Sequence, residues 1–249
     1  MYQLKKIAVV IPALNEEASI ATVVRELKLL LDQNGNALID DLVVCDNGSS
    51  DRTAVYASKA GARVVHESIK GYGAACLAGI RALNSPDIVV FVDADHSVLA
   101  ADVQKLLTPM SAGADLVIGS RVLGRRESGA LTVPQRFGNW LAARTIRFIW
   151  NAKVTDLGPL RAICHDALLA LQMESLQFGW TVEMQVKAIQ AGLAVEEVPV
   201  ASLKRIGQSK ISGTVRGVIG AALGIFGTIF MLRRREKRLM QSDLWQQRS

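Results

Sequence analysis

Short β-branched and apolar runs alternate with segments of helical spacing through the first half of this 249-residue chain. Continuous apolar strands separated by helices are typical of a mostly parallel sheet that helices cover on both faces. The sequence therefore predicts an α/β fold. Strands are expected at 5–12, 41–46, 62–67, 87–93 and 114–120, and helices at 16–33, 51–61 and 73–83.

The second half of the chain has a different pattern of predicted elements, with helices at 134–151 and 179–192 and a strand at 194–203. No internal repeat or low-complexity linker divides the two halves. We therefore expect one domain over 1–212, built from a first half (1–121) and a second half (122–212) that closes the same cleft. A Gly-rich apolar helix with a basic tail is expected at 213–249.

Polar side chains follow four of the predicted strands. Parallel α/β sheets bind ligands beyond the carboxyl ends of their strands, so these residues are expected to share one edge. They are Asn15 and Glu16, Asp46, Asp93 and Asp95, and Arg121. The pair in "FVDADHS" suits a divalent ion such as Mg²⁺, which takes one or two carboxylates and completes its shell with substrate phosphates and water.

The segment "VVCDNGSSDRT" ends a second predicted strand. Gly48 permits an unusual turn, and Ser50 or Asp51 is expected to cap the helix that follows. Asp46 precedes the turn and is not needed for capping, so its carboxylate is available to a nucleobase or ribose. Together, the metal, phosphate and base sites describe a sugar-nucleotide pocket. His96 is interpreted as a polar turn residue in preference to a third metal ligand.

Half of the residues are apolar, which is enough for a sizeable core. The three cysteines lie far apart, which predicts neither a disulfide framework nor a metal site and fits a reducing cytosol. The apolar run near the N-terminus is short and broken by Pro12, so it is interpreted as a first strand and not as a signal peptide.

The positive charge lies mainly in the C-terminal segment. Residues 201–249 hold ten Lys and Arg against two acids, although the net charge of the whole chain is only +6. An uncharged run of 16 residues, 217–232, precedes Arg233, Arg234 and Arg235. A bilayer core asks for about 20 apolar residues. We expect an interfacial helix at an anionic membrane surface, with a buried helix and a membrane span as the alternatives, and no nucleic-acid partner.

Seven motifs, in order over nearly the whole chain, resemble those of the family 2 glycosyltransferases, which have the GT-A fold. They are "VVIPALNEE" (9–17), "VVCDNGSSDRT" (43–53), "GYGAACLAGI" (71–80), "FVDADHS" (91–97), "VIGSR" (117–121), "DLGPLRAI" (156–163) and "RIGQSKISGT" (205–214). The last three resemble the branch of dolichyl-phosphate mannosyltransferases and polyprenyl-phosphate hexosyltransferases. That branch transfers a hexose from a nucleotide diphosphate to a lipid phosphate, with inversion.

The resemblance implies a nucleotide-sugar half at 1–121, an acceptor half at 122–212, and Mg²⁺ or Mn²⁺ as cofactor. Asp95 is implied as the direct metal ligand, and Asp93 lies nearer the ribose and the metal. Arg121 would face the donor phosphates. The nucleoside pocket would comprise Pro12, Ala13, Asn15, Glu16 and Asp46. Candidates for the acceptor phosphate and the departing diphosphate are Arg136, Arg161, Arg205, Ser209 and Lys210.

A phosphate acceptor is already ionised at neutral pH and needs a general base less than a hydroxyl does. Asp156 and Glu183 are each interpreted as a base, a metal-side ligand or a structural acid, and Asp156, before a Gly-Pro turn, is the preferred functional residue. The chain departs from the commoner family pattern at Asn47, which replaces an acid, and at His96 and Ser97. It also lacks the long membrane helices of some polyprenyl relatives.

Three functions are compatible with these features. The first is hexose transfer to a polyprenyl phosphate by a peripheral protein on the cytoplasmic face of the cell membrane. The second is a soluble glycosyltransferase acting on a hydroxyl group of a small molecule or glycan. The third is a non-catalytic protein that binds a sugar nucleotide, which the presence of both Asp93 and Asp95 disfavours.

Overall fold

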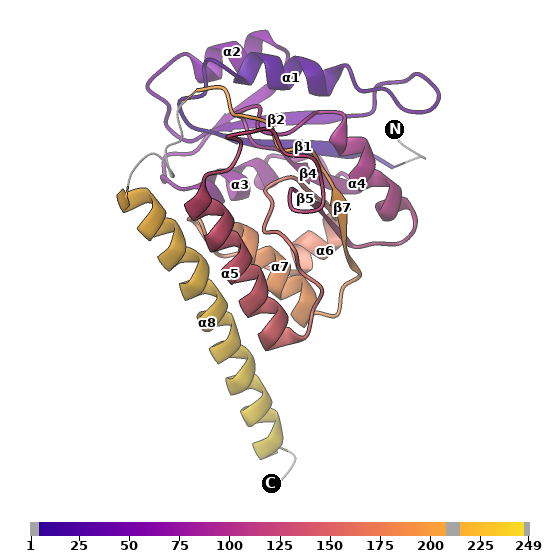
Figure 1. Ribbon diagram of the computed structural model, residues 1–249. Coiled ribbons are helices and arrows are strands. Elements are labelled where there is room, and N and C mark those ends of the chain that lie inside the picture. Colours follow the sequence, from indigo (N-terminus) through magenta and orange to yellow (C-terminus); the bar gives the residue numbers. More distant parts are fainter. Residues whose placement is uncertain (1–4, 208–214, 247–249) are drawn as a thin grey trace.

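The computed structural model describes residues 5–207 and 215–246 and confirms the α/β fold (Figure 1). Within these residues the strands are β1 Ile7–Ala13, β2 Asp41–Asp46, β3 Arg63–His66, β4 Ile88–Phe91, β5 Leu116–Ser120, β6 Arg161–Cys164 and β7 Val195–Pro199. The helices are α1 Ile20–Lys28, α2 Thr53–Lys59, α3 Tyr72–Arg81, α4 Asp102–Ser111, α5 Val133–Trp150, α6 His165–Ala170, α7 Trp180–Gln190 and α8 Val215–Gln246.

The described strands form one seven-stranded sheet in the order β3-β2-β1-β4-β6-β5-β7. Strands β1 to β4 pair in parallel, as do β5 and β7. Strand β6 alone is reversed, since it pairs antiparallel with both β4 and β5. The carboxyl ends of β1, β2, β4 and β5 therefore meet at one edge of the sheet, as the sequence predicts.

Helices cover both faces of the sheet. On one face, α1, α2 and α4 pack on β1, β2 and β4, and α1 places four buried residues at helical spacing: Ile20, Val23, Val24 and Leu27. On the other face, α3, α6 and α7 pack through Cys76, Leu168 and Met184 against β4 and β5. Apolar residues on both sides explain why the strand sequences are continuously hydrophobic.

Helices α5 and α8 form a further layer of helices beyond α7, and they run side by side in Figure 1. Thr132 caps α5 in a reciprocal capping box with Gln135. At the other end of α5, the Trp150 indole N–H donates to Glu236 of α8, 3.1 Å away. Ile229 of α8 is fully buried in this layer. No helix among the described residues is both long and apolar enough to cross a membrane.

Helix α8 is amphipathic in its packing, because Ile229 and Leu232 are buried while Leu223 and Phe230 are mostly exposed. It therefore closes the fold on one side, as expected for a buried helix, and exposes apolar side chains on the other, while association with a membrane surface stays a prediction. The division at 212/213 remains a prediction, since it falls outside the described residues.

Three elements were not predicted from the sequence. Helix α4 carries Pro109 in its last turn, which weakens its helical signal. Strand β6 has only four residues, and it begins at the buried, charged Arg161. Helix α6 follows β6 directly and has six residues, too few for a clear periodicity. Strand β4 is also shorter than predicted, so that Asp93 lies beyond its end.

Candidate functional site

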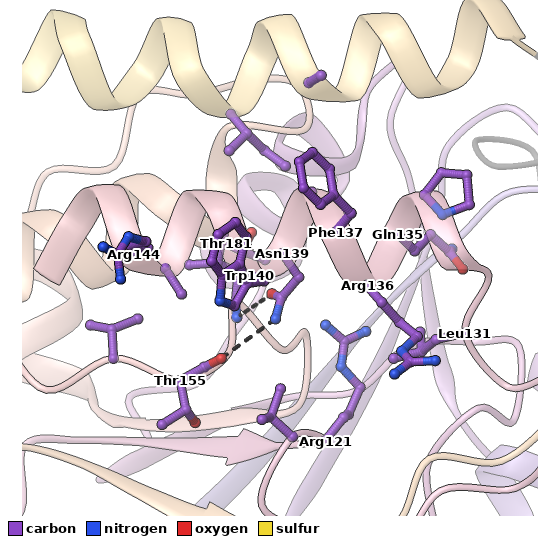
Figure 2. A pocket seen from close by; sticks show the side chains of 18 of the residues that line it. Arg121, Leu131, Gln135, Arg136, Phe137, Asn139, Trp140, Arg144, Thr155 and Thr181 are labelled. Atoms are coloured by element: carbon purple, nitrogen blue, oxygen red, sulfur yellow. Dashed lines mark hydrogen bonds between the residues drawn. The ribbon is translucent and has the colours of Figure 1, made fainter.

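Two cavities open near the strand ends, and they are neighbours, because Arg121 in the wall of one interacts electrostatically with Asp93 and Asp95 in the wall of the other. We call the first the strand-end cavity. Its volume is about 400 Å³, and it is lined by the chain that follows β1, β2 and β4 together with the start of α3. We call the second the α5–α8 cavity, which has a volume of about 800 Å³ and lies between α5, α8 and the loops after β5 (Figure 2). Of the predicted nucleoside-pocket residues, Pro12, Ala13 and Glu16 line the strand-end cavity.

Asp93 and Asp95 both line the strand-end cavity, as the sequence predicts for a shared site. The Tyr72 hydroxyl donates to Asp93 across 3.1 Å. Burial, followed by the adjacent charge of Asp95, raises the pKa of Asp93 to about 7. The Asp95 carboxylate accepts the Ser97 backbone N–H and pairs with Arg205, which reaches over from the loop after β7. A bound cation would therefore relieve the repulsion between these two acids.

The two acids can hold a cation only when other groups supply further ligands. Within the described ranges, no three His, Cys, Asp or Glu side chains lie close enough together to form a metal site on their own. Mg²⁺ and Mn²⁺ accept one or two carboxylates when phosphate oxygens and water supply the other ligands. The His96 ring is engaged elsewhere: it contacts Glu26 at 3.0 Å, and the φ of 59° at His96 fits the turn that was predicted.

Asp46 lies next to the strand-end cavity without lining it. Its carboxylate accepts the Ser49 backbone N–H at 3.3 Å and contacts the His66 ring at 3.2 Å. Asn47, the next residue, lines the cavity instead. Asn15 also stabilises the neighbouring turn, because its backbone N–H donates to Ser49. Asp51 accepts the Thr53 N–H at the first residue of α2, where a cap was predicted.

Asn47 fixes the loop at 67–71, a role that the sequence reasoning missed. Its amide nitrogen donates to the carbonyls of Glu67 and Ile69, and its amide oxygen accepts the Gly71 N–H at 2.7 Å. The loop brings Lys70 to the wall of the cavity. An acid at position 47 has no N–H to donate, so the departure from the commoner motif has a structural reason here.

The α5–α8 cavity combines arginines with apolar side chains. Arg121, Arg126, Arg136, Arg144 and Arg147 contribute the charge, and the apolar wall includes Leu131, Phe137, Trp140, Ile225 and Phe226. Among its described lining residues there is no Asp or Glu. The Arg144 guanidinium lies over the Trp140 ring, 5.9 Å from its centroid. An anion with an apolar body matches this surface.

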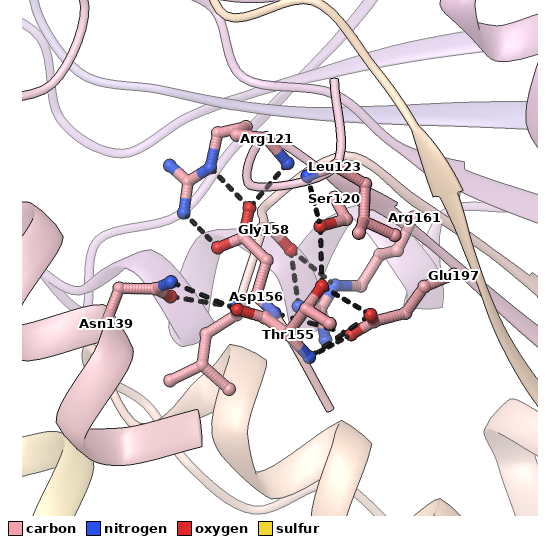
Figure 3. A network of polar contacts seen from close by, with 10 residues as sticks. Ser120, Arg121, Leu123, Asn139, Thr155, Asp156, Gly158, Arg161 and Glu197 are labelled. Carbon is pink, nitrogen blue, oxygen red and sulfur yellow. Dashed lines mark hydrogen bonds and ion pairs between the residues drawn. The ribbon is translucent and has the colours of Figure 1, made fainter. Parts of the chain in front are cut away.

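Arg121 and Asp156 form a bidentate ion pair (Figure 3). The Asp156 carboxylate accepts the backbone N–H of Arg121 at 2.7 Å, its Nε–H at 2.9 Å and an Nη2–H at 2.8 Å. Burial opposes ionisation of Asp156, but the charge and hydrogen bonds of Arg121 outweigh it and hold the pKa below its ordinary value. Such a carboxylate is a weak base.

Two further candidates point into the protein. Arg161 is completely buried and donates to the carbonyl oxygens of Gly158 and Thr181, and burial lowers its pKa to about 10. Glu183 accepts the backbone N–H groups of Glu174 and Ser175 and pairs with Lys187. The surroundings of both side chains are those of structural groups. Ser209 and Lys210 lie outside the described residues.

Comparisons with known proteins show the family of this chain. The profile of glycosyl transferase family 2 matches residues 8–170. An uncharacterized glycosyltransferase of Mycobacterium tuberculosis is 38% identical over 90% of this chain and 97% of its own length. A dolichyl-phosphate hexose transferase of Haloferax volcanii is 31% identical over 90% and 92%. An undecaprenyl-phosphate mannosyltransferase of Micrococcus luteus is 28% identical over 88% and 91%.

Solved structures show the same architecture. Glucosyl-3-phosphoglycerate synthase of Mycobacterium tuberculosis, in complex with Mn²⁺, UDP-glucose and phosphoglyceric acid, superposes with a TM-score of 0.74 at 24% identity, covering 93% of this chain and 80% of that one. Its complex with phosphoglyceric acid has a TM-score of 0.69 at 27% identity, with coverage of 90% and 81%. The fold is thus of the GT-A type, as the resemblance implies. The chain belongs to glycosyl transferase family 2.

Proposed function

We propose that the protein is an inverting glycosyltransferase that moves a hexose from a nucleotide-diphosphate sugar to a polyprenyl phosphate. The observation that carries the proposal is the pairing of two unlike cavities. The strand-end cavity contains the carboxylates Asp93 and Asp95, whereas the adjoining α5–α8 cavity is basic and apolar. The names of the Haloferax and Micrococcus relatives describe transfer to lipid phosphates and support the same reaction.

In this proposal the donor occupies the strand-end cavity. Asp95 and Asp93 would hold Mg²⁺ or Mn²⁺, and the bound ion would supply positive charge next to the leaving diphosphate. The solved relatives contain Mn²⁺ or Mg²⁺ together with UDP, which supports this cofactor. Arg205 pairs with Asp95 and lines the same cavity, so it is placed to contact the diphosphate. Asn47 and Lys70 complete the wall.

The acceptor phosphate would lie at the end of the α5–α8 cavity where Arg121 and Arg136 converge (Figure 2). The resemblance assigned Arg121 to the donor phosphates, but Arg121 lines this cavity and is not among the residues that line the strand-end cavity, so we reassign it to the acceptor. An ionised phosphate oxygen attacks the anomeric carbon as the bond to the diphosphate breaks, and the diphosphate leaves with the electron pair. No proton has to be removed from the nucleophile. Because Asp156 is engaged by Arg121, we assign it to orienting that arginine and not to acting as a base.

An acceptor with a long lipid tail also requires access to a membrane. Helix α5 exposes Val133, Phe137, Trp140 and Phe148, and Phe148 is 89% exposed. The arginines that follow the apolar part of α8 add positive charge. These features support peripheral binding to an anionic membrane surface, on the cytoplasmic face of the cell membrane.

The direct test is a panel of UDP-, GDP- and dTDP-hexoses incubated with polyprenyl phosphate and either Mg²⁺ or Mn²⁺. We expect radiolabel from one donor to enter the lipid phase, with loss of transfer when EDTA is added. Absence of metal-dependent transfer or donor hydrolysis with every donor would contradict the enzymatic proposal. Binding to phosphatidylglycerol vesicles, but not to phosphatidylcholine vesicles, is expected in parallel.

A second candidate is transfer to a small phosphorylated molecule through its hydroxyl group. It is favoured by the likeness to a synthase solved with phosphoglyceric acid, and the basic α5–α8 cavity suits such an anion as well. Adding 3-phosphoglycerate and glycerol 3-phosphate to the panel separates the two. Transfer to these acceptors alone would replace the lipid assignment.

A further inference from the structure

The loop at 154–158 is held from an unexpected side. Glu197 reaches it from β7, at the margin of the sheet (Figure 3). The Glu197 carboxylate accepts the Thr155 backbone N–H at 2.9 Å, the Thr155 hydroxyl at 2.5 Å and, more weakly, the Asp156 N–H at 3.4 Å. A half-buried carboxylate that collects three donors from two consecutive residues fixes the backbone there.

Other groups fix the same loop on its remaining sides. Asn139 of α5 accepts the Leu157 N–H at 2.9 Å, and the Ser120 hydroxyl lies 2.7 Å from that of Thr155. Gly158 packs against β5 so closely that a Cβ would lie 2.4 Å from the Gly119 carbonyl oxygen. The loop is therefore held by contacts from β5, β7 and α5.

The loop in turn determines where Arg121 points. Asp156 takes the Nε–H and one Nη2–H of the guanidinium, so the remaining N–H groups project from the opposite edge. Arg121 lines the α5–α8 cavity, and its side chain is 19% exposed. A bidentate carboxylate fixes the plane of a guanidinium as well as its position. Displacement of Asp156 would turn this edge away from an anion in the cavity.

We propose that Glu197 is a positioning residue for the transfer reaction: through Thr155 it sets Asp156, and through Asp156 it aims Arg121 at the acceptor phosphate. This inference rests on the proposed function. A glutamine at 197 would place an NH₂ group against N–H donors, so Glu197→Gln disturbs the loop while changing the side-chain volume little. Glu196, its exposed neighbour on β7, offers the matched control Glu196→Gln.

The first experiment is a double-mutant cycle in kcat. We expect Glu197→Gln to lower kcat about 10- to 100-fold with the donor KM unchanged, because small misplacements of an aligned group have effects of this size. In the Arg121→Lys background, which lacks the bidentate fork, the same change should cost less than about threefold. A wild-type kcat, or an equal loss in both backgrounds, would overturn the proposal. Glu196→Gln should behave as wild type.

A second measurement does not depend on activity. The Arg121 Nε–H signal in a ¹⁵N NMR spectrum, assigned by its disappearance in Arg121→Lys, reports the pair with Asp156. It should shift or broaden in Glu197→Gln and stay unchanged in Glu196→Gln. A wild-type protein without any transferase activity would refute the proposed function, whereas an unchanged signal in Glu197→Gln would refute the role of Glu197.

A less disruptive pair of variants covers the case in which Glu197→Gln fails to fold. Thr155→Val removes the hydroxyl that donates to Glu197 and keeps the backbone N–H, so a smaller loss of kcat and a smaller shift of the signal are expected. Thr155→Ser retains the hydroxyl and should restore both readouts. Equal behaviour of the two variants would contradict the proposed route from Glu197 to Arg121.

Discussion

The two cavities differ in the charges that would bind an anion. The strand-end cavity contains acids as well as Lys70 and Arg205, so it attracts a diphosphate only when a cation offsets Asp93 and Asp95. The α5–α8 cavity contains arginines and no described acid, and it attracts an anion directly. Donor binding should therefore depend on metal, whereas acceptor binding should depend on salt concentration and on apolar contact.

The largest expected effect lies at the acidic pair. Asp95→Asn removes one charge from the proposed metal site and leaves the Arg205 guanidinium without its ionic partner. We expect kcat to fall about 10³-fold, the scale seen when a group that stabilises developing charge is removed. Activity titrated with Mg²⁺ or Mn²⁺ measures this. Asp166→Asn, an exposed acid on α6, is the control, and retained activity in Asp95→Asn would disprove the metal role.

The second largest effect is expected on the stability of the protein, at the Arg121–Asp156 pair. Asp156→Asn leaves the mostly buried Arg121 without a counter-charge and should lower the free energy of unfolding by about 3 kcal/mol at pH 7. The folded pKa of Asp156 lies below its ordinary value of 3.8. The contribution of the pair is therefore present above that value and lost as the pH falls through the folded pKa.

Urea unfolding of wild type and Asp156→Asn at pH 7, 5 and 3 tests this dependence. The difference between the two proteins should be largest at pH 7 and pH 5 and should shrink toward pH 3. Asp41→Asn opens the exposed Arg63–Asp41 pair and is the matched control, with an expected cost below about 1 kcal/mol. A difference that is the same at every pH would exclude ionisation of Asp156 as its source.

The third effect is confined to the donor side. Asn47→Asp removes two N–H donors that hold the loop at 67–71, and it adds a negative charge to the cavity. We expect the donor KM to rise about tenfold while the acceptor KM stays unchanged. Steady-state kinetics with each substrate varied in turn distinguishes these outcomes. The exposed Asn34→Asp is the control, and an equal rise in both KM values would mean that the cavities are not separate.

The sequence could predict the strand-end cavity better than the α5–α8 cavity, for a physical reason. Parallel strands place the residues after β1, β2 and β4 at one edge, so local patterns suffice to bring Glu16 and Asp93 together. The direction in which each side chain points is harder to predict from the sequence. Asp46 and Asn47 are adjacent, yet only Asn47 lines the cavity, and Arg161 turns inward to carbonyl oxygens.

The α5–α8 cavity depends on contacts between distant segments. Helical spacing predicts α5, but it does not reveal that Ile225 and Phe226 of α8 form the opposite wall. The role of Glu197 was missed because its partners lie about 40 residues earlier in the chain. An acid that occupies a half-buried position in a strand was the available signal.

The smallest expected effect sharpens the comparison within the α5–α8 cavity. Arg136 lies beside Arg121, whereas Arg144 lies two turns further along α5 and stacks on Trp140 (Figure 2). If the acceptor phosphate lies at the Arg121 end, Arg136→Gln should raise the acceptor KM about fivefold, equivalent to about 1 kcal/mol for a partly exposed charge contact. Arg144→Gln should change it less, and Arg25→Gln on α1 should leave it unchanged. The effect of Arg136→Gln should also weaken as salt is added, since exposed charges are screened. The reverse order of Arg136 and Arg144 would place the phosphate at the other end of the cavity and contradict its assignment to the Arg121 end.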